Sequence, residues 1–174
     1  MSDPTALRHP ARIDDLLLYR LSRLLGVGGS PVIRLCEGRF GITRREWRVI
    51  ASLGPGLSLL SSELADHTQL DRARTSRCIS SLVTKGLLDR QGVPGDKRLA
   101  RVSLTDKGTR LYEALFPLVV RLNAQLVQSL DDGTLNALDS ALTAMQQAAE
   151  QIARQDDLPK ADRRRGGRSG HPTG

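Results

Sequence analysis

The sequence predicts a mainly α-helical fold with one small β-hairpin. Leu residues recur at spacings of three and four along most of the chain, which is the period of one helix face. Aromatic residues make up only 3% of the 174 residues, so aliphatic side chains between helices are expected to form the core. The period changes to two only between Leu87 and Leu104, and this alternation indicates two short strands.

The N-terminal part, residues 1–42, is expected to form two helices. Four apolar residues mark one face of the first: Ile13, Leu17, Leu21 and Leu24. The glycines and proline of residues 26–31 are expected to break this helix. The run Val32–Cys36 then predicts a second helix, which ends before Gly38 and Gly41.

Residues 43–104 hold the elements of a winged helix-turn-helix. Thr43 and Glu46 have the spacing of a capping box, which predicts the start of a helix. A short helix around Leu64, a turn, and a longer helix from Asp71 to Lys85 follow. The hairpin that forms the wing comes directly after this pair of helices.

The hairpin is predicted from its alternation and its turn residues. Leu87–Gln91 and Arg98–Leu104 are expected to be the strands, and Gly92–Asp96 the turn. One face of the second strand is apolar, with Ala100, Val102 and Leu104, whereas Leu99, Arg101 and Ser103 lie on the other. The tip of this wing is basic.

Residues 105–155 are expected to form two long helices. Thr105 caps the first, and Pro117 inside it predicts a kink or the loss of one hydrogen bond. Asp131-Asp132-Gly133 is expected to separate it from the second. Residues 156–174 are rich in Arg, Gly, Asp and Pro and predict a disordered basic tail. That tail accounts for +2 of the net charge of +7, so most of the charge belongs to the folded part.

No motif of an enzyme is present. The chain has no nucleophile elbow and no P-loop, and His9, His67 and His171 lack the spacing of metal ligands. We therefore expect no catalytic activity, no metal and no cofactor. The sequence has no secretory signal and no membrane span, and two cysteines suit a reducing compartment, so a soluble cytoplasmic protein is expected.

The helix from Asp71 to Lys85 is unusual because its first half is basic and polar. Such a helix suits the major groove of double-stranded DNA, where Arg, Ser and Thr can contact base edges. A solvated surface helix would look similar, but the basic hairpin directly downstream favours DNA. The candidate DNA-binding residues are Arg72, Arg74, Thr75, Ser76, Arg77, Lys97, Arg98 and Arg101.

Short motifs in this region resemble the MarR family of bacterial regulators. They are Ser76-Arg77, Lys85-Gly86-Leu87, Asp96-Lys97-Arg98 and Leu104-Thr105-Asp106-Lys107-Gly108. The resemblance implies a homodimer in which residues 1–42 and 105–155 of two chains interleave, with the winged domain 43–104 on each. It further implies a repressor of transcription, associated with the bacterial nucleoid, that binds a pseudo-palindromic operator. Arg74 to Arg77 would face the major groove, and Arg98, oriented by Asp96, would enter the minor groove.

A small aromatic carboxylate or phenolic compound is the expected effector, because members of this family commonly bind one near the dimer helices. The candidate ligand-binding residues are Tyr19, Arg20, Arg39, Trp47 and Arg48. Residues 36–48 are similar to regulators of aromatic-acid and nicotinate-type breakdown. The alternative for this set is that Trp47 is a core residue and Arg48 is merely exposed.

Two other functions stay open at this point. The chain could be an architectural winged-helix protein that binds DNA without sequence preference, in which case its affinity would depend only on phosphate contacts. It could also be a redox-sensing regulator that uses Cys36 or Cys78, which would require an accessible thiol with a depressed pKa.

Overall fold

The computed structural model describes residues 4–68 and 70–155. Its elements are the 3₁₀ turns η1 (Pro4–Leu7) and η2 (Ile13–Asp15), the helices α1 (Leu17–Gly28), α2 (Ser30–Phe40), α3 (Arg44–Leu53), α4 (Ser61–Thr68), α5 (Arg72–Thr84), α6 (Asp106–Val127) and α7 (Asp132–Ala153), and the strands β1 (Ser58–Leu60), β2 (Leu88–Val93) and β3 (Asp96–Leu104). The mainly α-helical class with a small β-wing is confirmed. The predicted tail, residues 156–174, lies outside the described residues.

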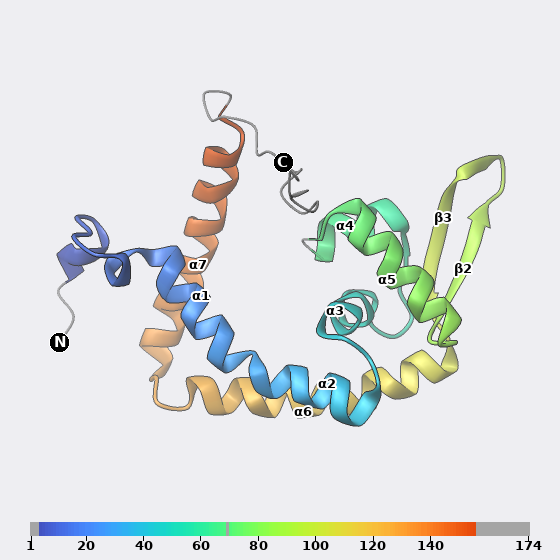
Figure 1. Cartoon of the computed structure of the whole chain (residues 1–174), viewed down its shortest axis with the longest axis horizontal. Coiled ribbons are helices and arrows are strands. Elements are labelled where there is room, and N and C mark those ends of the chain that lie inside the picture. Colours follow the sequence, from blue (N-terminus) through green and yellow to red (C-terminus); the bar gives the residue numbers. More distant parts are fainter. Residues whose placement is uncertain (1–3, 69, 156–174) are drawn as a thin grey trace, which may run out of the picture. The chain divides into compact units, whose positions relative to one another are not determined.

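The chain forms two compact units, Met1–Val127 and Gln128–Gly174. Within the first, α2 packs against α6, and α3 packs against α4 and α5 (Figure 1). Within the second, Asp131 caps the start of α7, and its side chain accepts a hydrogen bond from the Thr134 amide at 2.7 Å. The assignment of residues 1–42 and 105–155 to dimerisation stays a prediction.

The glycine-rich stretch 26–31 ends the first helix as predicted, but the break is confined to Gly29. Helix α1 continues through Gly26 to Gly28, and α2 begins directly afterwards with Pro31 in its first turn. A glycine weakens a helix by about 1 kcal/mol without forbidding it, and proline is tolerated in a first turn. At Gly29 a Cβ atom would lie 2.6 Å from the Leu25 carbonyl oxygen, so this tight junction requires glycine.

The core is aliphatic and centres on α3. Its fully buried side chains include Val49, Ile50, Leu53, Leu64, Leu82 and Leu115. Trp47 is 7% exposed, and its ring centroid lies 6.0 Å from that of Tyr112 on α6. This core fixes α3 between the helix-turn-helix of α4 and α5 and the long helix α6.

A buried carboxylate joins α3 to the end of α5. Glu46 is 3% exposed, and its side chain accepts hydrogen bonds from the Thr43 amide at 2.6 Å and the Ser81 hydroxyl at 2.6 Å. Lys85 Nζ donates to it at 2.8 Å. Burial opposes the ionised form, but these hydrogen bonds, led by that from Lys85, together outweigh it, so the pKa of Glu46 lies below its ordinary value. The capping box predicted at Thr43 is confirmed.

The wing is a three-stranded antiparallel sheet in the order β1-β3-β2. Strand β1 was not predicted, because its three residues are too few to show an alternating pattern. The strands of the hairpin extend further than predicted, so its turn is tighter and lies around Pro94 and Gly95, where Gly95 has a φ of 85°. Ala100 and Val102 are buried, whereas Leu99 and Arg101 are exposed, which confirms the predicted faces of β3.

Helix α6 begins at the base of the wing. The Gly108 amide donates to Thr105 Oγ1 at 3.1 Å, so the predicted cap is present. A Cβ atom at Gly108 would overlap the Leu87 carbonyl oxygen, which explains the glycine at this position. Helix α6 continues through Pro117 without a break. Among the described residues, no helix has the length and apolar character needed to cross a membrane.

Candidate nucleic-acid interface

Helix α5 exposes most of its basic and polar residues. Asp71 caps its start, and the Asp71 side chain accepts a hydrogen bond from the Arg74 amide at 2.7 Å. The buried residues of the helix are Thr75, Cys78, Ile79 and Leu82, which recur with the helical period and pack on the core. Its exposed residues are Arg72, Ala73, Arg74, Ser76, Arg77, Ser80, Val83 and Thr84. The outer face of α5 is therefore polar and positively charged.

Thr75 is not on that outer face, and its predicted contact with the major groove is wrong. It is 1% exposed, and its hydroxyl donates to the Asp71 carbonyl oxygen at 3.1 Å. The physical reason is the helical period, which places it on the same side as Ile79 and Leu82. The run Arg74 to Arg77 is continuous in sequence, but a helix turns one of its four residues inward.

Two arginines of α5 make local contacts that orient their side chains. Arg74 Nε lies 3.2 Å from Asp71 Oδ2, with both side chains about half exposed. Arg77 Nε donates to the Ala73 carbonyl oxygen at 3.3 Å. Because both guanidinium groups remain at the surface, their outward donors can contact a further acceptor.

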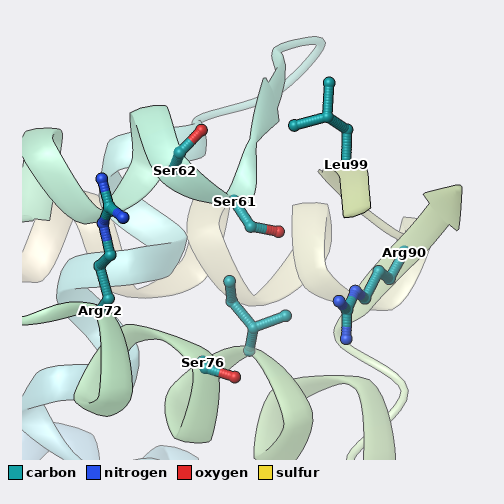
Figure 2. A pocket seen from close by; sticks show the side chains of 7 residues that line it. Ser61, Ser62, Arg72, Ser76, Arg90 and Leu99 are labelled. Atoms are coloured by element: carbon teal, nitrogen blue, oxygen red, sulfur yellow. The ribbon is translucent and has the colours of Figure 1, made fainter. Parts of the chain in front are cut away.

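A hollow of about 310 Å³ lies between α5, the start of α4 and the wing. Its lining residues are Ser61, Ser62, Arg72, Ser76, Ile79, Arg90 and Leu99. Figure 2 shows Arg72 and Arg90 on opposite sides of this hollow. Hydroxyl and guanidinium donors around one hollow suit a phosphate group, which carries oxygen acceptors and negative charge.

Sequence reasoning missed three polar residues of this hollow. Ser61 and Ser62 were not among the predicted DNA-binding residues, and Arg90 was predicted only as part of the strand Leu87–Gln91. Arg90 pairs with Val102 in the sheet. The alternation of β2 could have identified it, because Arg90 is two residues after the buried Leu88 and therefore lies on the same face of the strand.

A second hollow lies on the other flank of α5. Its volume is about 400 Å³, and it is lined by Arg45 of α3 together with Arg74, Arg77 and Cys78 of α5. Arg45 was not predicted to contribute, since it precedes the helix-turn-helix. Helix α5 thus has a group of arginines on each side.

The wing carries three of the predicted DNA-binding residues, and their roles stay predictions. Arg101 Nη1 donates to the Ser58 carbonyl oxygen at 3.1 Å, so its guanidinium is held toward β1. Lys97 and Arg98 lie at the start of β3, next to the turn of the hairpin. In Figure 1 the turn between β2 and β3 is at the end of the hairpin away from α5 and α6.

The five residues predicted to bind a ligand do not share one surface. Trp47 lies in the core, which agrees with the alternative stated for it. Arg48 donates from Nη1 to the Thr68 carbonyl oxygen at 3.1 Å and lines a hollow of about 420 Å³. The remaining three, Tyr19, Arg20 and Arg39, are exposed on α1 and α2, and none of them lines that hollow.

Both cysteines are buried. Cys36 is 0% exposed and Cys78 is 9% exposed. Burial is the main effect at both sites and raises the pKa of each thiol. A sensing cysteine needs the opposite properties, so the structure disfavours the redox alternative. Residues 4–68 and 70–155 also hold no group of His, Cys, Asp and Glu suited to a metal ion.

Two helices joined by a turn, an exposed basic second helix and an adjoining hairpin define a winged-helix protein of the DNA-binding class. Comparison with known proteins shows which family this part of the chain matches. Residues 40–99 match the MarR family. Residues 40–99 of this chain therefore form a domain of the MarR type.

Three similar proteins illustrate the match. The chain is 25% identical over 133 residues to the uncharacterised HTH-type transcriptional regulator YhbI of Bacillus subtilis, covering 76% of this chain and 86% of YhbI. It is similar in fold to the S. aureus MepR–DNA complex, with a TM-score of 0.68, 21% identity, and coverage of 76% of this chain and 98% of MepR. It is also similar in fold to the PcaV regulator of Streptomyces coelicolor in complex with its natural ligand. The TM-score is 0.66, the identity is 22%, and the match covers 86% of this chain and 99% of PcaV.

Proposed function

We propose that the protein is a homodimeric, sequence-specific DNA-binding repressor that binds a pseudo-palindromic operator. One observation carries this proposal, namely the exposed polar face of α5 with an arginine-lined hollow on each flank. The similarity in fold to MepR, whose structure is a complex with DNA, supports it.

The geometry suits a helix in the major groove. This groove is about 12 Å wide and admits one α-helix between two sugar–phosphate backbones. The outermost residues of α5, which include Ser76, Arg77 and Ser80, would contact base edges. Arg72 and Arg90 on one flank, and Arg45 and Arg74 on the other, would contact phosphates.

The wing would complete the contact. Lys97, Arg98 and Arg101 would place positive charge over the neighbouring minor groove or backbone, as the predicted roles require. Contacts of this kind with phosphates would position the protein without reading sequence. Sequence preference would then depend on the few residues at the outer face of α5.

Exposed apolar surface supports a homodimer. In the first unit, Leu18 is 78% exposed and Val27 is 80% exposed on α1, and Leu126 is 53% exposed on α6. In the second unit, Leu142 is 45% exposed and Ile152 is 54% exposed on α7. Large apolar side chains gathered on helices at both ends of a chain are typical of an interface between subunits.

We further propose that a small aromatic carboxylate or phenolic effector releases the DNA. The fold similarity to PcaV, whose structure holds a natural ligand, supports ligand control. Of the predicted residues, Tyr19, Arg20, Arg39 and Arg48 remain candidates because they are exposed. Thermal-shift screening with aromatic carboxylic acids tests this part, and a panel without any stabilising compound would contradict it.

A gel-shift experiment tests the repressor proposal at the level of residues. Arg98→Ala is expected to weaken binding to every DNA, because a backbone or groove contact is lost. Arg77→Ala is expected to weaken operator binding and also to relax base preference. If both variants bind operator DNA like the wild type, the assignment of helix and wing is wrong.

A further inference from the structure

Helix α3 carries three arginines, Arg44, Arg45 and Arg48, and the proposed function gives a phosphate contact only to Arg45. Arg48 follows Arg44 by four residues and Arg45 by three, so it neighbours both of them on the surface of the helix. Arg45 and Arg48 are exposed, and Arg44 is partly buried. We call these three residues the α3 arginine strip.

The charge of the α3 arginine strip is not neutralised by its surroundings. The three arginines form no ion pair with a carboxylate among residues 4–68 and 70–155. Together with Ile33, Glu37, Thr43 and Leu70 they line the hollow of about 420 Å³, in which Glu37 is the single acidic residue of the lining. The hollow therefore carries an excess of positive charge and suits an anion.

One of these side chains is held by a hydrogen bond to the backbone, and another lies close to the backbone. Arg48 Nη1 donates to the Thr68 carbonyl oxygen at the end of α4. The Arg44 guanidinium lies against Gly29, with Nη1 3.1 Å from where a Cβ atom would be. A guanidinium that is positioned in the free protein loses less conformational entropy when it contacts a phosphate.

The α3 arginine strip is continuous with the basic flank of α5. Arg45 lines both the hollow of about 420 Å³ and the hollow of about 400 Å³ that contains Arg74 and Arg77. In Figure 1, α3 lies on one side of α5 and the β2–β3 hairpin on the other. Arginines thus extend from the outer face of α5 across α3, on the side away from the wing.

We propose that the α3 arginine strip binds the sugar–phosphate backbone of the DNA on the side of α5 opposite the wing. This inference rests on the proposed function, because a helix in the major groove has one backbone on each side. Arg72 and Arg90 face one backbone, and Arg45, continued by Arg44 and Arg48, faces the other. The strip reads no base, so it contributes affinity and salt dependence but not sequence preference.

The salt dependence of DNA binding tests this inference. Fluorescence anisotropy of the full-length protein with a selected DNA site is measured from about 50 to 200 mM salt. Each lost phosphate contact is expected to reduce the slope of log K against log salt by about 0.9. Arg45→Ala and Arg48→Ala should each show such a reduction, with equal losses on specific and scrambled DNA.

Matched variants separate charge from folding. Arg45→Lys keeps the charge and should keep most of the slope, and Arg121→Ala removes an exposed arginine of α6 and should leave the slope unchanged. Circular dichroism melting verifies that each variant folds. If Arg45→Ala reduces the slope and Arg45→Lys does not, the result supports a contact between the Arg45 charge and a phosphate.

Three outcomes would overturn the inference in different ways. If the wild type binds DNA and Arg77→Ala weakens it, but Arg45→Ala and Arg48→Ala keep the wild-type slope, the strip is not part of the interface and the proposed function stands. If the wild type binds no DNA, the proposed function fails as well. If Arg48→Ala keeps the slope but abolishes stabilisation by benzoate, the hollow is instead a site for a small carboxylate.

Discussion

Lys85 Nζ lies 2.8 Å from Glu46 Oε2, and this contact connects the end of α5 with the start of α3. Glu46 is almost fully buried, whereas the Lys85 side chain is about one-third exposed at 34%. Lys85 Nζ also donates to the Gly41 carbonyl oxygen at 3.0 Å. The orientation of α5 relative to α3 thus depends on a carboxylate that is almost fully buried.

Glu46→Gln is expected to destabilise the fold. The substitution removes the charge that pairs with Lys85 and leaves hydrogen-bond donors without their acceptor, which costs about 1–3 kcal/mol for buried groups. Urea unfolding followed by circular dichroism measures the change. Glu113→Gln, on the exposed side of α6, is the control and should change stability by less than about 0.5 kcal/mol. Equal stability of both variants would contradict the importance of the contact.

The same carboxylate should make stability depend on pH. Because the pKa of Glu46 in the folded protein is lowered from 4.5, its contribution is fully present above the unfolded value and is lost as pH falls through the folded value. The unfolding free energy of the wild type should therefore fall more steeply below about pH 4.5 than that of Glu46→Gln. Urea unfolding of both proteins between pH 3 and 6, at steps of about 0.5 pH unit, measures this difference. If the unfolding free energies of the two proteins change in parallel with pH, Glu46 is not the group responsible.

Thr75 and Ser76 should behave differently although they are neighbours. Thr75 is buried in α5, so Thr75→Val should leave the preferred DNA sequence unchanged. Ser76→Ala removes an exposed hydroxyl of the outer face and should alter the preference at one base pair by about 1–3 kcal/mol. Competition binding against a library of single-base variants distinguishes the two. A changed preference in Thr75→Val would contradict the inward position of this residue.

Arg90→Ala should weaken DNA binding without changing its sequence preference. Arg90 lines the hollow beside the wing and is expected to contact one phosphate. The slope of log K against log salt should fall by about 0.9. An unchanged slope, measured by anisotropy on the same DNA, would remove Arg90 from the interface.

Gly108→Ala should destabilise the protein even though alanine is the better helix former. At an exposed position inside a helix, replacing glycine by alanine stabilises the fold by about 1 kcal/mol. At Gly108, however, the new Cβ would overlap the Leu87 carbonyl oxygen at the base of the wing. Thermal melting should therefore show a lower Tm. A higher Tm would mean that the backbones of α6 and of the segment before β2 can separate at no cost.

Much of the fold could be predicted from the sequence because its signals are local. The capping box of Thr43 and Glu46, the cap at Thr105 and the alternation of β3 each depend on residues close in sequence, and the structure has all of them. Strand β1 could not be predicted, since it exists only through pairing with β3, some forty residues away. Its three residues carry no pattern of their own.

The candidate site was predicted less completely, because its flanks come from different elements. The basic half of α5 is visible as a run in sequence, but Arg45 and Arg90 join it only through tertiary packing. The same packing excludes Thr75, which sequence reasoning had counted with its neighbours. Trp47 was grouped with possible ligand contacts because exposure cannot be read from residue type alone.

The ratio of specific to non-specific DNA affinity tests the central claim most directly. A pseudo-palindromic site is first selected from random DNA by the full-length protein. Its affinity is then compared with that of a scrambled duplex at about 0.15 M salt. We predict that the selected site binds at least about 10³-fold more tightly. Equal affinities for both duplexes, together with a steep salt dependence, would contradict a sequence-specific repressor and indicate an architectural DNA-binding protein.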